Sequence, residues 1–154
     1  MKRIKKILWL LFISFINCNE VEYITVDICG DEGIIEEINW ISLEIYSPKC
    51  GCSYKEIYNL KGIYWPLTQS IIVDKDPWRD IDLILKIEGY TETDNPPIIV
   101  KTVIIPMDTK KISVKLSSSC KGINICNNEF NFVTGETCIE GECKTLPIAP
   151  LECK

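Results

Sequence analysis

The sequence predicts an all-β protein that ends in a small cysteine-rich unit, and three observations carry this prediction. Apolar and polar residues alternate through most of residues 20–116, which is the pattern of strands with one face on a core. Clusters of glycine, proline, aspartate and asparagine separate the alternating runs, as turns require. After residue 117 the alternation stops and cysteine and glycine become frequent, which is typical of a loop-rich unit held by disulfides.

The first 17 residues have the features of an export signal. Four basic residues lie within residues 2–6, and an unbroken apolar run follows over residues 7–13. Such a run is too short to cross a bilayer core of about 30 Å as a helix. We therefore expect residues 1–17 to be a lipoprotein signal peptide.

The residue after this signal is Cys18, and we expect it to be acylated. Residues 15–18 resemble a bacterial lipobox, with Phe15 and Asn17 at the places where an aliphatic and a small residue are usual. No small-x-small cleavage site lies near Cys18. The chain has nine cysteines, and a lipid on Cys18 leaves an even number that can all pair. An uncleaved signal anchor and a plain secreted product are the alternatives.

Removal of the signal makes the chain more acidic. Residues 1–17 contain four of the 17 basic residues and none of the 22 acidic ones, so the mature chain has 13 basic residues and a net charge of −9. An acidic surface repels phosphate backbones. We expect no nucleic-acid partner.

Seven alternating runs make up the region 18–117. They are residues 24–28, 41–45, 54–60, 67–73, 81–87, 99–105 and 112–116. Turn-forming residues lie between them, and no helix longer than a turn at 34–38 is expected. Seven short strands at this spacing predict an antiparallel sandwich of immunoglobulin or fibronectin-III type.

A domain boundary is expected at the serines of residues 117–119. We expect a β-sandwich domain over residues 18–117 and a cysteine-rich disulfide knot with a tail over residues 118–154. The tail contains two prolines, which disfavour regular pairing, and we expect its cysteine to pin it back. The cysteines expected in disulfides are Cys29, Cys50, Cys52, Cys120, Cys126, Cys138, Cys143 and Cys153.

The order of these features resembles that of lipoproteins from myxobacteria and their relatives. The matching residues are Trp65–Thr68, Ile112–Leu116, Cys120–Cys126 and Glu136–Cys143. The resemblance covers most of the mature chain, and its specific part is the C-terminal motif. It departs from the family in a longer gap between the second and third cysteines of that motif, and in the additional Cys29, Cys50, Cys52 and Cys153. Because that family has no assigned activity, the resemblance implies an envelope location and an architecture, and it implies no reaction.

Analogy with other small knots implies a pairing for the cysteines of this motif. By that analogy, Cys120 pairs with Cys138 and Cys126 with Cys143. The remaining four are then expected to pair as Cys29 with Cys50 or Cys52, which leaves one of these two for Cys153.

The chain contains no histidine. Ser-His-Asp triads, Cys-His dyads and histidine-ligated metal sites are therefore excluded, and we expect neither an enzyme nor a cofactor. A thiolate zinc site that includes Cys50 and Cys52, and a calcium site among the carboxylates of residues 74–82, are alternatives. Disulfides and a solvated acidic turn are the commoner outcomes for such residues in an exported chain, so we expect no metal.

Two tryptophans are candidate ligand contacts. Trp65 and Trp78 lie at or beside expected turns, where an exposed indole ring can stack on a sugar or anchor a protein partner. Packing against the core is the more common role for tryptophan.

These inferences combine into one expected function. We expect a cell-envelope protein anchored to the membrane, most naturally the outer membrane, by a lipid on Cys18, with an extracytoplasmic domain that binds an envelope protein or a polysaccharide or has a structural role. The alternative is an accessory carbohydrate-binding module of an envelope enzyme. A third possibility is a thiol-redox protein.

Overall fold

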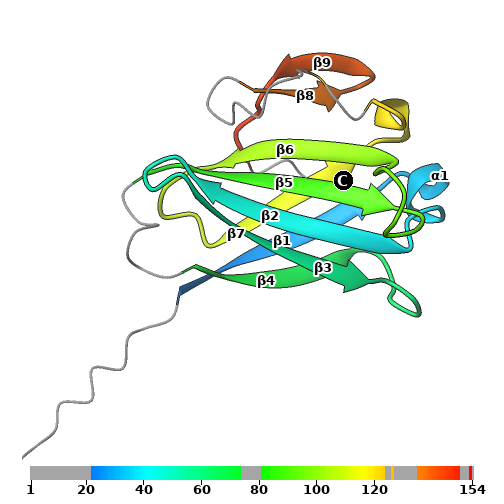
Figure 1. Cartoon of the computed structure of the whole chain (residues 1–154), viewed down its shortest axis with the longest axis horizontal. Coiled ribbons are helices and arrows are strands. Elements are labelled where there is room, and N and C mark those ends of the chain that lie inside the picture. Colours follow the sequence, from blue (N-terminus) through cyan, green and yellow to red (C-terminus); the bar gives the residue numbers. More distant parts are fainter. Residues whose placement is uncertain (1–21, 74–80, 124–125, 127–134, 150–152, 154) are drawn as a thin grey trace, which may run out of the picture.

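The structure of the protein, a computed structural model, describes residues 22–73, 81–123, 126, 135–149 and 153, and it consists mostly of β-strands (Figure 1). Residues 1–21, which include the expected signal and Cys18, lie outside the described part, as do Trp78 and most of the acidic turn near it. The strands are β1 (Glu22–Gly30), β2 (Trp40–Ser47), β3 (Cys52–Asn59), β4 (Leu67–Val73), β5 (Leu83–Tyr90), β6 (Ile99–Ile105), β7 (Lys111–Leu116), β8 (Glu136–Ile139) and β9 (Glu142–Thr145). The helical elements are α1 (Glu32–Ile35) and the 3-10 turn η1 (Ser118–Cys120).

The first seven strands form two sheets that face each other. One has the order β4-β1-β7 and the other the order β3-β2-β5-β6, while β8 and β9 form a separate hairpin. Figure 1 shows the two larger sheets as layers, with the hairpin beyond β6. Seven strands therefore precede the β8–β9 hairpin in the chain.

One strand pair differs from the expected antiparallel arrangement. β1 and β7 are parallel, with Val26 opposite Ile112 and Ile28 opposite Val114. The chain leaves β6 in the four-stranded sheet, turns through residues 106–110 and enters the other sheet in the direction of β1. Alternation looks the same in parallel and antiparallel strands of this kind, so the sequence pattern could not distinguish them.

A single hydrophobic core joins the two sheets, as the alternation predicts. Along β6, buried and half-buried residues alternate without interruption. Fully buried residues from both sheets, such as Val26 and Leu85, belong to one cluster, and each isoleucine or leucine in it contributes about 1.5 to 3 kcal/mol. Gly89 of β5 lies under the segment after α1, where an added Cβ would be 2.8 Å from Ile38 Cδ1 and 2.9 Å from Ile99 Cγ2.

Asp31 connects the end of β1 to the expected domain boundary. Its carboxylate accepts hydrogen bonds from the Ser118 backbone N–H at 2.9 Å and the Ser117 hydroxyl at 3.1 Å, and Lys115 lies 3.1 Å away. The hydrogen bond from the Ser118 N–H, followed by that from Lys115, lowers the Asp31 pKa to about 2. The serines that follow β7 are thus bonded to the start of α1.

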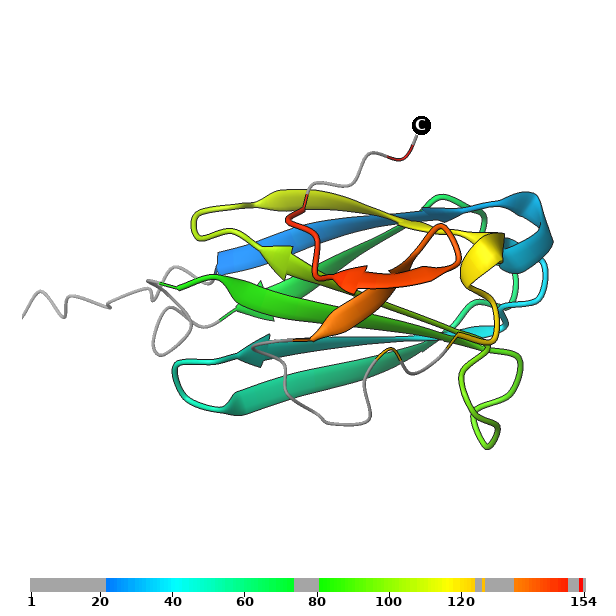
Figure 2. The same cartoon turned by 90° about the horizontal axis from the view of Figure 1, so that it is seen from above.

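The C-terminal unit, which we define as the described residues from Ser118 onward, lies along the free edge of β6 (Figure 2). Gly122 N–H donates to the Ile98 carbonyl at 2.8 Å, and Ala149 N–H donates to the Ile104 carbonyl at 2.8 Å. Between them, Thr102 N–H donates to Thr137 Oγ1 at 2.9 Å. These bonds occupy backbone groups that an edge strand would otherwise expose for pairing with another chain.

The same unit contributes to the core. Cys120, Cys138 and Ala149 are buried members of the hydrophobic cluster. Lys101 shares the inward face of β6 with Ile99 and is also buried. Its Nζ donates to the Cys138 carbonyl at 2.8 Å, and burial lowers the Lys101 pKa.

Candidate functional site

Four disulfides join all eight cysteines of the described residues. Cys120–Cys138 and Cys126–Cys143 span 18 and 17 residues within the C-terminal unit, and they are the pairs that the analogy with small knots implies. Cys29–Cys153 spans 124 residues and ties the tail to β1. A disulfide sulfur has no negative charge, so these cysteines, as paired here, do not offer the thiolates that the zinc alternative needs.

The expected pairing of Cys29 with Cys50 or Cys52 is wrong. Cys50 and Cys52 pair with each other, and Cys29 pairs with Cys153. The reason is topological: Cys29 lies at the end of β1 that leads into α1, whereas Cys50 and Cys52 lie at the β2–β3 turn, at the opposite end of the sheets (Figure 1). Sequence spacing contains no information about which ends meet.

Trp65, one of the two candidate ligand contacts, is half-buried and packs against the core cluster. It precedes Pro66 in a cis peptide bond. The more exposed ring beside it belongs to Tyr64, whose exposed fraction is 91%. Trp65 therefore packs against the core, and no pattern in the sequence pointed to Tyr64.

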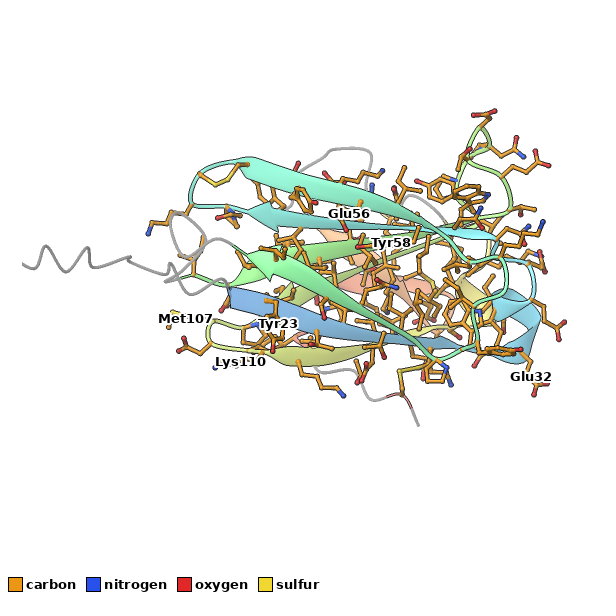
Figure 3. The ribbon with its side chains drawn as sticks, turned by 90° about the horizontal axis from the view of Figure 1, so that it is seen from below. Tyr23, Glu32, Glu56, Tyr58, Met107 and Lys110 are labelled. Carbon is orange, nitrogen blue, oxygen red and sulfur yellow. A yellow bond between two sulfur atoms is a disulfide. The ribbon has the colours of Figure 1, made fainter. Side chains whose placement is uncertain are left out.

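A second group of aromatic side chains lies on β3, an edge strand of the four-stranded sheet. Glu56 accepts hydrogen bonds from the hydroxyls of Tyr54 and Tyr58, two residues away on either side. Figure 3 labels Glu56 and Tyr58 on this strand. The hydrogen bond from Tyr54, and then that from Tyr58, lowers the Glu56 pKa. We call Tyr54, Glu56 and Tyr58 the β3 edge strip. Tyr54 is exposed, while Glu56 and Tyr58 are half-buried, so the strip offers an aromatic surface next to a carboxylate.

A buried charge cluster lies on the other face of the same sheet, around Glu88 of β5. The Glu88 carboxylate contacts Lys55 Nζ at 2.8 Å and Lys86 Nζ at 2.6 Å, and it accepts hydrogen bonds from the Ser42 hydroxyl at 3.0 Å and the Tyr90 hydroxyl at 2.6 Å. Its side chain is only 8% exposed. Sequence reasoning missed this cluster because its members come from three strands.

The hydrogen-bond partners of Glu88 set the pKa of its carboxyl group. Burial alone would raise its pKa, but hydrogen bonds from Lys55, Lys86 and Tyr90 outweigh this effect and lower the pKa to about 2. A carboxylate held in this way by four donors stays ionised and does not exchange protons near neutral pH. The cluster therefore supports the sheet, and it is a poor candidate for acid–base chemistry.

The comparisons with known proteins found no relative of this chain. No family model, no curated protein and no solved structure matches the chain. None of the helices in the described part of the chain is long and apolar enough to cross a membrane. The candidate sites therefore rest on geometry: the disulfides, the β3 edge strip and Tyr64.

Removing one disulfide at a time, by replacing both of its cysteines, should cost more unfolding free energy the longer the loop that the disulfide closes. We expect the double variant Cys29→Ala/Cys153→Ala to lose up to about 5 kcal/mol of unfolding free energy, and each of the two pairs of the C-terminal unit to cost about 3 kcal/mol, because a cross-link restricts the unfolded chain more when its loop is longer. Cys50→Ala/Cys52→Ala is the matched control, with the smallest loss. Urea unfolding without reductant measures all four. A larger loss for the control than for Cys29→Ala/Cys153→Ala would contradict this ranking.

Acid should weaken the fold through Glu88. Because the folded-state pKa of about 2 lies below the ordinary value of 4.5, the ionised form stabilises the fold above about pH 4.5, and this stability, about 3 kcal/mol, is lost as the pH falls toward 2. Glu88→Gln should be less stable at pH 7 and should lose less stability between pH 5 and 2, as measured by urea unfolding at each pH. Exposed Glu36 provides the control Glu36→Gln. Parallel pH profiles for Glu88→Gln and the unchanged protein would refute the assignment.

Proposed function

We propose that this protein is anchored to the cell envelope by a lipid on Cys18 and has an extracytoplasmic, non-enzymatic role in binding or structure. The observation that carries the proposal is the disulfide pattern. Each of the eight cysteines in the described residues is in a pair, so none of them is left as a partner for Cys18. Four disulfides favour an oxidising compartment outside the cytoplasm, and an unpaired cysteine directly after an export signal is the residue that lipoprotein processing would acylate.

The architecture supports a scaffold for binding. We propose that the seven main strands form a sandwich of immunoglobulin or fibronectin-III type, with sheets of three and four strands around one core. Such scaffolds present edges and loops to partners while the core stays closed. The absence of histidine and the saturated Glu88 cluster favour a role without catalysis. The resemblance to myxobacterial lipoproteins supports the outer membrane as the location.

The candidate binding surface lies around β3 and the connection from β3 to β4. Large apolar side chains are exposed there, and they are Tyr54, Ile57, Ile63 and Tyr64. Aromatic residues at a sheet edge are typical anchors for a protein partner. We propose an envelope protein as the partner of this surface.

The alternative is an accessory carbohydrate-binding module of an envelope enzyme. The β3 edge strip supports it, because tyrosine rings next to a carboxylate provide a stacking surface and a hydrogen-bond acceptor for sugar hydroxyls. Tyr64, exposed over 91% of its surface, provides a further ring near the end of the same strand.

Lipidation can be tested by mass spectrometry of the full-length protein made in a bacterium with lipoprotein processing. We expect the mature chain to begin at an acylated Cys18 and to sediment with membranes. Cys18→Ser should abolish the lipid and release the protein, because only the thiol accepts the diacylglycerol. Asn17→Gly is the matched control, and it should retain or increase acylation because a small residue is usual there. A mature chain with an intact N-terminal segment and a free Cys18 thiol would overturn the proposal.

Sugar binding can be separated from protein binding with soluble peptidoglycan fragments as the probe. If the alternative holds, the fragments change the intrinsic fluorescence, and Tyr64→Ala weakens their binding by about tenfold, the cost of one stacking contact above 1 kcal/mol. Tyr23→Ala is the control, because Tyr23 is also exposed but lies on the other sheet (Figure 3). Fluorescence that stays unchanged at saturating fragment concentrations would remove the support for sugar binding.

A further inference from the structure

The disulfide at the β2–β3 turn closes by far the shortest loop of the four. Cys50 and Cys52 are separated by a single residue, Gly51. Gly51 has a φ of +64° and its N–H donates to the Ser47 carbonyl at 2.9 Å, so the backbone closes the turn without help from the disulfide. Cys50 is exposed and Cys52 half-buried.

An approaching thiol meets this disulfide without unfolding the protein. The residues on either side of Cys50, from Pro48 to Gly51, are exposed, whereas Cys120 and Cys138 of the knot are 3% and 1% exposed and belong to the core. Cys126–Cys143 also joins a half-buried to an exposed cysteine, so access separates the turn disulfide from the core pair, and its position opposite Ser47 separates it from Cys126–Cys143. Accessibility is one of the main determinants of the rate of thiol–disulfide exchange, and exposed disulfides are the labile ones.

Opening this disulfide also leaves the fold in place. β2 and β3 are paired along their whole length, from Trp40 opposite Asn59 to Ser47 opposite Cys52. The backbone ladder and the turn hydrogen bond of Gly51 do not depend on the sulfur atoms. The turn can therefore exist with either a disulfide or two thiols.

Ser47 provides an independent observation at the same place. It is fully buried, and its hydroxyl is the one buried side-chain N or O atom in the described residues that has no hydrogen-bond partner. Ser47 stands directly opposite Cys52 in the ladder, and opposite side chains share a face with their Cβ atoms about 4.5 to 5.5 Å apart. A hydroxyl in this position can donate to a Cys52 thiolate, which gives a role to a group that would otherwise only cost stability.

We propose that Cys50–Cys52 is a thiol-exchange site whose substrates are dithiols, with Ser47 as the residue that stabilises the leaving sulfur. The thiolate of an incoming dithiol attacks Sγ of Cys50, a bond forms between the two sulfurs, and the Cys50–Cys52 bond breaks. The electron pair of the broken bond leaves on Cys52 Sγ, which accepts the Ser47 hydrogen bond and then a proton from water.

A second step completes the exchange. The other thiolate of the incoming dithiol attacks its own sulfur in the mixed disulfide, and Cys50 leaves as a thiolate that is protonated in turn. The incoming dithiol is oxidised to a disulfide by two electrons, and the Cys50–Cys52 pair is reduced by the same two. This exchange is stoichiometric, and it is independent of the proposed lipid anchor.

The first test is graded reduction of the full-length, oxidised protein with dithiothreitol, followed by alkylation and peptide mapping. We expect Cys50 and Cys52 to be labelled about tenfold or more ahead of the buried pair Cys120–Cys138, because access governs the rate. They should also precede the similarly exposed Cys126–Cys143, because Ser47 stabilises the leaving sulfur, and the circular dichroism spectrum should stay unchanged. Simultaneous labelling of all pairs, or earlier labelling of Cys126 and Cys143, would overturn the proposal.

The second test compares the reactivity of Cys50 with that of Cys52, and it measures the effect of Ser47 on the reduction rate. With oxidised glutathione as the probe, Cys52→Ser should form a stable mixed disulfide on Cys50 faster than Cys50→Ser does on half-buried Cys52. In the otherwise unchanged chain, Ser47→Ala should slow reduction of the pair by about tenfold, the effect of one hydrogen bond to a charged group, without lowering the unfolding free energy. Ser53→Ala, an exposed neighbour on the opposite face of β3, is the control. Equal reduction rates for Ser47→Ala and Ser53→Ala would refute the role of Ser47, and equal trapping rates for the two cysteine variants would refute attack at Cys50.

Discussion

The free edge of β6 is the constraint on which the arrangement of the molecule depends. An edge strand with bare N–H and C=O groups pairs with other chains unless something covers it. Here the cover comes from the same chain: Gly122, Thr137 and Ala149 bond in turn to the segment from Ile98 to Ile104. Because the covering residues also bring Cys120 and Cys138 into the core, the C-terminal unit and the β-strands stabilise each other.

The disulfides follow from this arrangement. Covering β6 requires segments with little regular structure, and such segments lose much conformational entropy when they are ordered. Cys120–Cys138 and Cys126–Cys143 reduce this cost locally, and Cys29–Cys153 returns the tail to β1. Lys101 is buried beside the knot, and its Nζ donates a hydrogen bond to the Cys138 carbonyl. Because a buried amine without a hydrogen bond would destabilise the core, the core depends on the position of the Cys138 carbonyl in the knot.

Sequence reasoning identified the features that depend on local pattern and missed those that depend on register. Strands such as β6 could be predicted because buried and less buried residues alternate along them. The parallel pairing of β1 with β7 could not, because alternation does not encode direction. The Glu88 cluster draws its members from β2, β3 and β5, so it becomes visible only when the strands are aligned. The same limit applies to Ser47 and Cys52, which are five positions apart in the chain and directly opposite in the ladder.

The two edges of the four-stranded sheet differ, and this difference bears on both proposals. β6 is covered, whereas β3, the other edge of the same sheet, keeps exposed side chains. Successive residues of a strand point to opposite faces, so Cys52, Tyr54, Glu56 and Tyr58 share one face of β3. The disulfide at the β2–β3 turn is thus the first member of the row that continues as the β3 edge strip. A partner that docks along this row meets its aromatic rings and the sulfur of Cys52 on one surface, with the more exposed Cys50 at its end. If both proposals hold, binding at Tyr54 and thiol exchange at the turn use one face of β3, and a protein partner with a dithiol can satisfy both.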